Sequence, residues 1–205
     1  VFVCHQLLLD PQKNILVVSA SKNRADDFST FTLRLINEID VLAHLRPLES
    51  QRQSKVSFDV RPARASHAPS VKSLGITSQL TGSRSDLVIA DDVETSQNSA
   101  TMGMRDKLST QVKEFESIIK PLGRIIFLGT PQTEMSLYNE LPKRGYKLKL
   151  WPARYPEIKS LRNMSKNISP VISKDWHIDK VGFPTDPLRF DFEDLREREM
   201  SYGKS

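Results

Sequence analysis

The sequence predicts an α/β protein in which a mostly parallel sheet is flanked by helices. Three apolar runs, at 14–20, 86–90 and 124–128, lack the polar alternation of a half-exposed strand. Such runs are typical of strands that are buried on both faces of a parallel sheet. Between them, apolar residues recur at three- and four-residue spacing, which is the pattern of amphipathic helices. Buried strands that alternate with such helices indicate a sheet with helices on its faces.

Local patterns divide the first half of the chain into elements. Residues 1–9 are apolar without alternation and predict the end of a helix, which Asp10-Pro11 stops. Ser21 is the expected N-cap of a second helix, which Pro47 ends. The apolar residues of that helix are Phe28, Phe31, Leu35, Ile39 and Leu42. Two further strands are expected in this half, at 56–60 and 71–76.

The second half continues the alternation as far as residue 151. A helix is expected over 100–120, and Pro121-Leu122-Gly123 ends it. The apolar stripe of that helix is formed by Leu108, Val112, Phe115 and Ile119. Three later elements are expected: a short helix near 135–141, a strand at 146–151 and a charged helix over 192–202. The periodicity fades between 152 and 187, which predicts an irregular excursion or linker.

Composition restricts the possible classes of function. Of the 205 residues, 30 are Lys or Arg and 25 are Asp or Glu, so the net charge is +5. This excess permits a polyanionic partner but does not require one. The apolar runs are too short for a transmembrane helix. The single cysteine, Cys4, leaves no internal disulfide or cysteine-rich zinc site, and the four histidines lack the spacing of metal ligands.

Two adjacent carboxylates, Asp91 and Asp92, follow the apolar run at 86–90. Open α/β sheets bind ligands at the carboxyl ends of their strands. In P-loop NTPases a carboxylate in this place helps to hold Mg²⁺, and the next acid commonly orients or deprotonates the attacking water. Successive strand residues point to opposite faces, so the two acids have different roles unless the backbone turns. The alternative is a pair of helix-capping or turn aspartates.

Thr130 and Gln132 follow the apolar run at 124–128 in the same manner. A hydroxyl and an amide at the end of a buried strand fit hydrogen bonds to a phosphate or to the attacking water. A plain strand-to-loop turn is the alternative. Because two strands of one predicted sheet end in polar residues, each strand end supports a functional interpretation of the other.

Basic residues give a third group of candidates. Arg84 precedes the acidic strand and fits a phosphate contact in its own subunit or in a neighbouring one. Arg61, Arg64, His67 and Lys72 form a basic loop-strand cluster that fits a nucleic-acid backbone. Solvated charges without a function are the alternative in both cases.

The segment Gly203-Lys204-Ser205 matches the last part of a phosphate-binding loop pattern. The pattern also requires a glycine at position 198, which is Arg198, and a buried strand upstream, where the sequence predicts a charged helix. We therefore expect that this chain contains no Walker A loop.

Eight segments are characteristic when they are taken together and in order. They are Ile15–Lys22, Ser70–Ile76, Gln79–Arg84, Asp91–Glu94, Ser99–Gly103, Leu128–Glu134, Pro184–Phe190 and Asp194–Glu199. This series resembles the large terminase subunit of short-tailed podoviruses, which is also called DNA maturase B. The resemblance extends over nearly the whole chain.

The resemblance implies a packaging ATPase of the additional-strand P-loop type (ASCE), which in the family precedes a nuclease domain with an RNase H-like fold. Residues 1–152 would then form an incomplete ATPase core, and residues 153–205 an irregular excursion and linker helix toward the nuclease domain. The chain starts with Val1 rather than Met. We expect a fragment, with the Walker A loop before Val1 and the nuclease domain after Ser205.

The resemblance also implies roles for individual residues. Asp91 takes the place of the Walker B ligand of Mg²⁺, and Asp92 that of the catalytic glutamate of many relatives. Glu94 is the alternative general base. Residues 128–131, with Thr130 and the nearby Gln132, resemble the coupling motif that links hydrolysis to DNA movement. The same comparison makes Arg84 the candidate phosphate-sensing arginine and leaves Arg61, Arg64 and Lys72 as candidate DNA contacts.

The cofactors implied by the resemblance are ATP and Mg²⁺. The implied partners are double-stranded DNA, a small terminase subunit, the procapsid portal and further copies of the chain in a ring. No membrane partner is expected, and the implied location is the host cytoplasm. Two other functions remain open: a nucleic-acid-binding or scaffold segment without activity, and a fragment of a helicase-like ATPase. The isolated segment is expected to be inactive because it lacks a phosphate loop.

Overall fold

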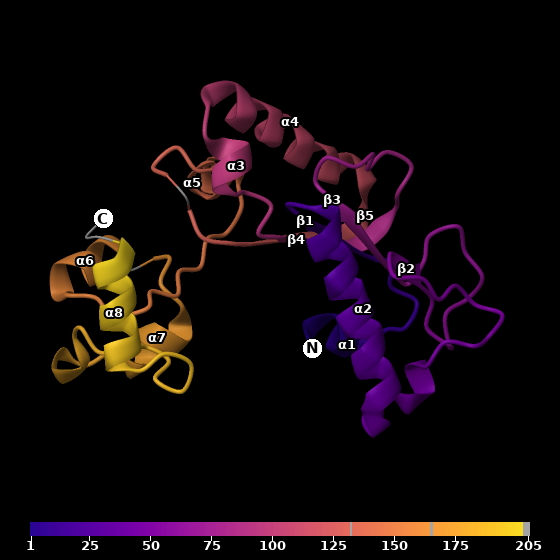
Figure 1. The fold of residues 1–205 in the computed structure, drawn as a ribbon, viewed down its shortest axis with the longest axis horizontal. Helices are drawn as coiled ribbons and strands as arrows, with labels where there is room; N and C mark the ends of the chain where they lie inside the picture. The colour runs from indigo at the N-terminus through magenta and orange to yellow at the C-terminus, as the bar shows by residue number, and fades with distance from the viewer. Residues whose placement is uncertain (132, 165, 203–205) are drawn as a thin grey trace. The chain divides into compact units, whose positions relative to one another are not determined.

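The chain consists of two compact units, Val1–Glu140 and Leu141–Ser205, in a computed structural model that describes residues 1–131, 133–164 and 166–202 (Figure 1). Each unit has its own packing and is described in turn. The expected division into residues 1–152 and 153–205 as functional domains remains a proposal.

The first unit is built on a five-stranded sheet with the order β2-β3-β1-β4-β5. Its strands are β1 (Ile15–Ser19), β2 (Ser57–Phe58), β3 (Val71–Gly75), β4 (Ser85–Asp91) and β5 (Ile119–Leu128). Four of them pair in parallel, and β2 is antiparallel to β3. The structure therefore confirms an α/β fold with a mostly parallel sheet.

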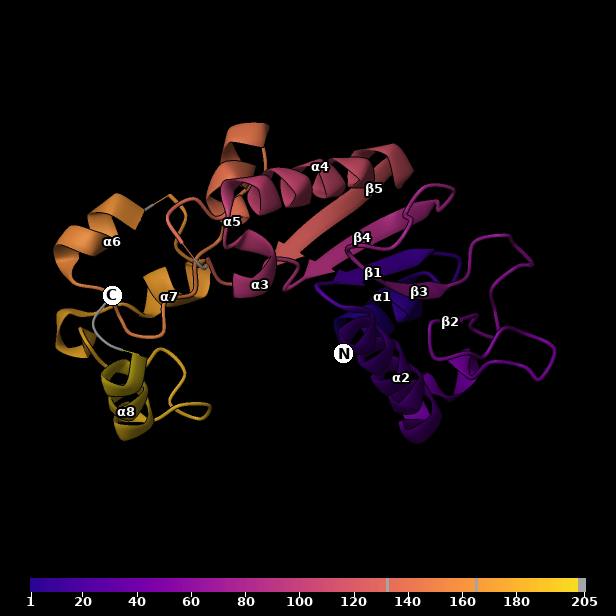
Figure 2. The same ribbon diagram turned by 45° about the horizontal axis from the view of Figure 1, so that its top comes forward.

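Helices cover both faces of this sheet, as Figure 2 shows. They are α1 (Phe2–Leu9), α2 (Lys22–Glu38) and α4 (Met102–Ile118). On one face, α1 and α2 share an apolar core with alternate strand residues such as Val17 and Ile89. On the other face lies α4, whose Phe115 ring is 5.8 Å from the ring of Phe127 in β5. The flanking helices that the sequence predicts are confirmed.

Two expected elements of the first half are shorter than their patterns suggest. Ser21 caps α2 as predicted, accepting a hydrogen bond from the amide of Arg24 at 3.4 Å. The helix ends at Glu38 rather than at Pro47, because Ile39 takes an extended conformation. A 3₁₀ helix, η1 (Asp40–Leu45), follows it. The strand expected at 56–60 is reduced to the two residues of β2.

The junction of α4 with β5 differs from the expectation. The buried stripe of α4 is Leu108, Val112, Phe115 and Ile118, whereas Ile119 is the first residue of β5. Pro121-Leu122-Gly123 do not separate a helix from a strand but lie within β5. Leu122 has a positive φ of 65°, and the pairing of β5 with β4 shifts its register in this region. As the last strand in the order, β5 is only partly buried, so its predicted burial on both faces is wrong.

Three short helices complete the loops after β4 and β5. They are α3 (Ser96–Ser99), α5 (Leu137–Glu140) and the 3₁₀ helix η2 (Leu141–Arg144), which opens the second unit. The helix expected near 135–141 is therefore present as α5 and η2.

The second unit is largely helical. It contains α6 (Ile158–Met164), α7 (Pro170–Asp175), the 3₁₀ helix η3 (Ile178–Lys180) and α8 (Phe192–Tyr202). Its small core is formed by Tyr155, Ile168 and Ile172. The charged helix at 192–202 is confirmed, but the irregular excursion contains helices, and the strand expected at 146–151 is only an isolated bridge between Leu150 and Ile168. None of the helices in the described ranges is long and apolar enough to cross a membrane.

Candidate functional site at the carboxyl edge of the sheet

The strand order creates a switch point between β1 and β4. The chain continues from β1 to β3 on one side and from β4 to β5 on the other. The helices that follow these two strands, α2 and α4, lie on opposite faces of the sheet (Figure 2). Open α/β sheets bind ligands beside such a point, at the carboxyl ends of the strands. Asp91 lies there, in register with Ser19 of β1 and Leu128 of β5.

The backbone turns immediately after Asp91. Asp92 has a φ of 47°, in the left-handed region, and its amide donates to the carbonyl oxygen of Leu128 at 2.9 Å. Aspartate tolerates this conformation better than most residues. The turn interrupts the alternation of a regular strand, and the carboxylate of Asp92 acts on that of Asp91. Burial raises the pKa of Asp91 above 3.8, and the charge of Asp92 raises it further, while Arg24 opposes both effects.

Arg24 is the cation of this site. It lies in the first turn of α2, and its guanidinium nitrogen Nη1 is 3.6 Å from Oδ2 of Asp92. Both side chains are about half exposed, so the pair contributes little to stability. Sequence analysis missed Arg24, although it lies only three residues after the predicted N-cap. Its place near Asp91 depends on the pairing of β1 with β4.

Glu94 occupies a buried position rather than the exposed edge. Its side chain is only 3% exposed, and its Oε2 accepts hydrogen bonds from the Ser136 hydroxyl at 3.0 Å and the Leu137 amide at 2.6 Å. Its other oxygen, Oε1, is buried and has no hydrogen-bond partner among the described residues. The structure thus places Glu94 against the start of α5, whereas Asp92 is half exposed.

Tyr138 connects the ends of β4 and β5. Its hydroxyl donates to the carbonyl oxygen of Leu128 at 3.2 Å. Burial is the largest effect that raises its pKa, to about 12, and the charges of Asp92, Glu94 and Asp91 add to it, while a contact with the backbone of Glu94 opposes them. The sequence contains no motif that would have identified Tyr138.

The phenol of Tyr138 also packs against Gly129. A Cβ atom on Gly129 would lie 2.1 Å from the tyrosine oxygen, so only glycine fits without a shift. Thr130, the next residue, is exposed at the same edge of the sheet as Asp91. Gln132 lies outside the described residues.

Two of the basic candidates lie at the other end of the strands. Arg84 precedes β4, and its Nη1 donates to the carbonyl oxygen of Ser117 at 3.0 Å. The seven residues of β4 separate it from Asp91 by about 20 Å. Lys72, near the start of β3, directs its ammonium group to the hydroxyl of Ser83 at 3.2 Å. The structure therefore does not bring these residues together with the acids.

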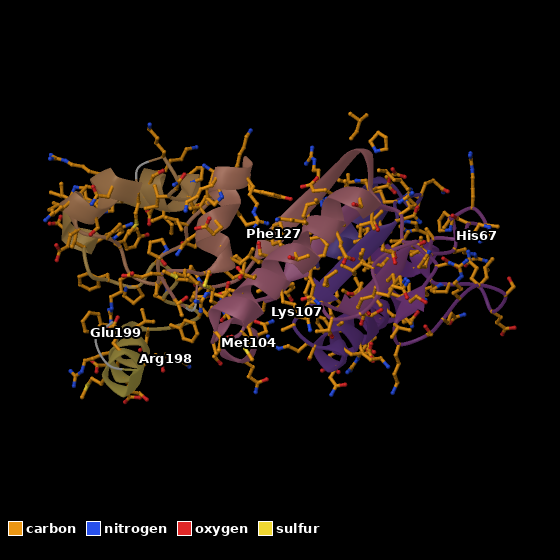
Figure 3. All side chains as sticks on the ribbon, turned by 90° about the horizontal axis from the view of Figure 1, so that it is seen from above. His67, Met104, Lys107, Phe127, Arg198 and Glu199 are labelled. Atoms are coloured by element: carbon orange, nitrogen blue, oxygen red, sulfur yellow. The ribbon has the colours of Figure 1, made fainter. Side chains whose placement is uncertain are left out.

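Arg61 and Arg64 lie in an exposed loop that we call the basic loop, residues 61–69. Figure 3 labels its His67, which is also exposed. The side chain of Gln12 donates to the carbonyl oxygen of Pro62 at 2.7 Å and accepts from the amide of Arg64 at 3.1 Å. Asn14 donates to the carbonyl oxygens of Ala68 and Pro69 at 3.1 and 2.9 Å. Side chains from the α1–β1 connection thus hold both ends of the loop.

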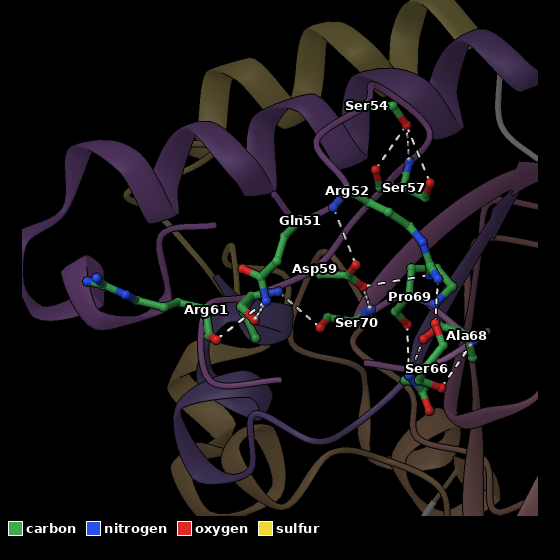
Figure 4. Close-up of polar contacts among 12 residues, drawn as sticks. Gln51, Arg52, Ser54, Ser57, Asp59, Arg61, Ser66, Ala68, Pro69 and Ser70 are labelled. Carbon is green, nitrogen blue, oxygen red and sulfur yellow. Dashed lines mark hydrogen bonds and ion pairs between the residues drawn. The ribbon is translucent and has the colours of Figure 1, made fainter. Parts of the chain in front are cut away.

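The segment before the basic loop is equally well ordered by hydrogen bonds (Figure 4). Gln51 donates to the carbonyl oxygen of Val60 at 3.1 Å, and Asp59 accepts from the amide of Ser70 at 3.2 Å. Nη1 of Arg52 lies 3.8 Å from Oδ1 of Asp59, and Nη2 of Arg52 donates to the carbonyl oxygen of Ser66. All three arginines, Arg52, Arg61 and Arg64, are exposed, but the guanidinium of Arg52 is engaged by Asp59 and Ser66.

Comparison with known proteins agrees with the resemblance seen in the sequence. The chain is 52% identical over 211 residues to a protein described as terminase, large subunit, from Enterobacteria phage T3. The chain is a relative of the large terminase subunits. The alignment covers 100% of this chain and 36% of the phage T3 protein, so the chain spans about a third of that relative's length. No protein-family model matches the chain.

The acids of this terminase relative suit a hard divalent cation. Asp91 and Asp92 place two carboxylates beside one arginine, and burial together with Asp92 raises the pKa of Asp91. A cation near Asp91 would offset that excess of negative charge. The described part of the chain holds no group of three or more potential metal ligands. Mg²⁺ commonly needs only one or two protein carboxylates, because substrate phosphates and water complete its shell.

Proposed function

We propose that the chain is part of the ATPase of a viral DNA-packaging motor. The observation that carries this proposal is the pair Asp91–Asp92 at the switch point of a parallel sheet, in a relative of the large terminase subunits. In the intact protein, the carboxyl edge of the sheet would bind the phosphates of ATP together with Mg²⁺. Hydrolysis at this edge would drive double-stranded DNA into a procapsid.

The proposed chemistry assigns different roles to the two acids. Asp91 is the residue that would hold Mg²⁺, which when bound offsets negative charge on the phosphates. Asp92 is half exposed beside it and orients or deprotonates the attacking water. Among the described residues, its side chain forms an ion pair with the guanidinium of Arg24 at 3.6 Å and is still half exposed, so water can reach the carboxylate. Thr130, at the end of the adjacent strand, is the candidate sensor of the terminal phosphate.

The position of β5 at one end of the described strand order gives the proposed phosphate loop a place. β5 is the last strand of the described sheet, and residues 125–127 are only partly buried. A further parallel strand on this edge would end beside Thr130 and close to Asp91. We place the Walker A strand and loop of the intact protein there, which completes a P-loop fold of the ASCE type.

The partners of the intact protein follow from the same proposal. The exposed Arg61 and Arg64 are proposed DNA contacts, because the side chain of Gln12 holds the backbone of their loop and the two arginines are exposed to solvent. Arg84 lies too far from Asp91 to act within its own chain, so its phosphate contact is proposed in a neighbouring subunit of a ring. A small terminase subunit and the procapsid portal complete the proposed motor, which acts in the host cytoplasm.

The proposal is tested by substitution of the two acids in the intact protein. Asp92→Ala should abolish ATP hydrolysis while ATP still binds, and Asp91→Asn should weaken the Mg²⁺-dependent part of ATP binding. Turnover and nucleotide affinity are measured for both. Asp106→Asn removes an exposed carboxylate from α4 and serves as the matched control. Near-normal turnover in Asp92→Ala would refute the role of this residue.

A further inference from the structure

The loops that follow β4 and β5 are joined by a set of contacts that the proposed chemistry does not use. We call this set the loop junction; its residues are Asp92, Glu94, Leu128, Gly129, Ser136, Leu137 and Tyr138. The carbonyl oxygen of Leu128 accepts from the Asp92 amide at 2.9 Å and from the Tyr138 hydroxyl at 3.2 Å. Backbone and side-chain donors from two separate loops thus converge on the end of β5.

Glu94 makes the second connection between the loops. Its Oε2 accepts from the Ser136 hydroxyl at 3.0 Å and the Leu137 amide at 2.6 Å, which are the residues that begin α5. The Ser136 hydroxyl in turn accepts from the amide of Tyr138 at 3.2 Å. The side chain of Glu94 therefore fixes the turn from which Tyr138 reaches back to β5.

The position of Glu94 does not suit a general base. The residue is 3% exposed, and no ion pair to it is found among the described residues. A base must lie within hydrogen-bond reach of the water that it deprotonates. Burying a carboxylate without a counter-ion is unfavourable, and an apolar side chain would serve packing better. The carboxylate instead suits a residue that holds the start of α5 in position, because its Oε2 accepts from the Ser136 hydroxyl and the Leu137 amide.

Through Gly129, a movement of the backbone beside Thr130 would reach the loop junction. A Cβ atom at this position would be 2.1 Å from the tyrosine oxygen and 2.3 Å from its ring carbon Cζ, so the backbone and the phenol touch directly. Displacement of residues 129–130 toward the ring must therefore move Tyr138, and with it the start of α5. Interfaces packed this closely shift between discrete arrangements rather than deform continuously.

We infer that Glu94 and Tyr138 are positioning residues that transmit changes at the Asp91–Asp92 edge to the loop after β5. They act through the loop junction and not on the reacting atoms. This inference rests on the proposed ATPase function. By this inference, contacts with α5 help to couple hydrolysis to DNA movement, together with the strand-end residue Thr130.

The test uses the intact protein and measures two quantities in each variant: kcat and KM for ATP, and the length of DNA packaged per ATP hydrolysed. Glu94→Gln keeps an oxygen that accepts from Ser136 and Leu137, so it should retain both quantities within about twofold. Glu94→Ala and Tyr138→Phe break the junction, so they should lower the DNA length per ATP about fivefold or more, the usual lower range of coupling between sites. Their kcat should change far less.

Tyr155→Phe is the matched control, because it removes a hydrogen-bonded tyrosine hydroxyl from the second unit. It should leave the DNA length per ATP unchanged. The isosteric variants Glu94→Gln and Tyr138→Phe remain informative even where Glu94→Ala does not fold.

Two results would overturn the inference, and a third would instead refute the proposed function. A fall of about 100-fold or more in kcat for Glu94→Gln would identify Glu94 as a general base and overturn the inference. An unchanged ratio of DNA to ATP in Tyr138→Phe would overturn it as well. If the unsubstituted intact protein showed no Mg²⁺-dependent ATP hydrolysis, the proposed function itself would fail.

Discussion

Asp92 combines a backbone conformation that is uncommon for residues other than glycine with a proposed functional position. A non-glycine residue with φ of 47° costs free energy, and such residues cluster at sites where geometry matters more than stability. Here the turn aims the Asp92 amide at Leu128 and leaves its carboxylate beside Asp91. One residue thus both ends the pairing of β4 and supplies the second acid.

Gly129 provides a test of packing at the same edge. Gly129→Ala forces a methyl group against the Tyr138 phenol, so it should lower the free energy of unfolding by about 1–3 kcal/mol. Gly103→Ala is the control, because Gly103 lies in helix α4 with open space around it. That change should instead raise the free energy of unfolding by about 0.4–1 kcal/mol. Urea unfolding of both variants measures the difference, and equal effects would contradict the close contact.

The sequence predicted the acids of the site but not their surroundings. Asp91 and Asp92 could be found because an apolar run marks the strand that carries them, and strand ends are where such sheets bind ligands. Tyr138 and Arg24 could not be found in this way, since both reach the site through tertiary packing. The burial of Glu94 also depends on α5, which lies more than forty residues further along the chain.

At the scale of elements, β5 shows why local patterns were insufficient. Pro121 and Gly123 are ordinary signs of a helix end or a turn. Proline is nevertheless tolerated on an edge strand, where its missing amide costs no ladder hydrogen bond, and β5 is the last strand of the described sheet. The strands buried on both faces, β1 and β4, were predicted well because burial itself creates their apolar runs.

In the second unit, a carboxylate joins two short helices. Asp175, the last residue of α7, accepts hydrogen bonds from Lys180 at 2.6 Å and from the hydroxyl of Tyr155. These bonds, that of Lys180 first, lower the pKa of Asp175 below its ordinary 3.8. The stabilisation is therefore present above about pH 3.8 and is lost as the pH falls through the lower pKa of the folded form.

We therefore expect the second unit to lose stability below about pH 3.8, and Asp175→Asn to remove that part of the pH dependence. The same substitution should lower stability at neutral pH, because it removes the charged partner of Lys180. Both tryptophans of the chain, Trp151 and Trp176, lie in this unit, so their fluorescence reports on it alone. Asp186→Asn, at an exposed position of the same unit, is the control. An identical acid transition in both variants would contradict the role of Asp175.

At the scale of the first unit as a whole, the candidate acids and the candidate basic residues lie at opposite ends of the parallel strands. The acids lie at the carboxyl ends, whereas the basic loop, Lys72 and Arg84 lie near the amino ends. The length of β4 sets their separation at about 20 Å. A protein of this charge, +5 overall, can therefore bind two polyanions without forcing them into one place. The proposed nucleotide and DNA sites are separated by the sheet itself.

The separation predicts that DNA binding can be weakened without an effect on nucleotide binding. The double substitution Arg61→Ala, Arg64→Ala in the intact protein should lower DNA affinity and reduce the slope of log affinity against log salt by about 2. Affinity for Mg²⁺–ATP should not change. The matched control removes two exposed lysines of α4, Lys107→Ala with Lys113→Ala. A similar loss of slope in the control would argue against a specific contact by the basic loop.

The partly exposed outer side of β5 has a consequence for handling the protein. An uncovered strand edge presents a row of backbone donors and acceptors, and it readily recruits a strand from another molecule. In β5 the run 125–127 of isoleucine and phenylalanine favours such recruitment, whereas Lys120 and Pro121 at its start oppose it. Preparations of this chain should therefore self-associate with increasing concentration, through intermolecular β-pairing along the run 125–127.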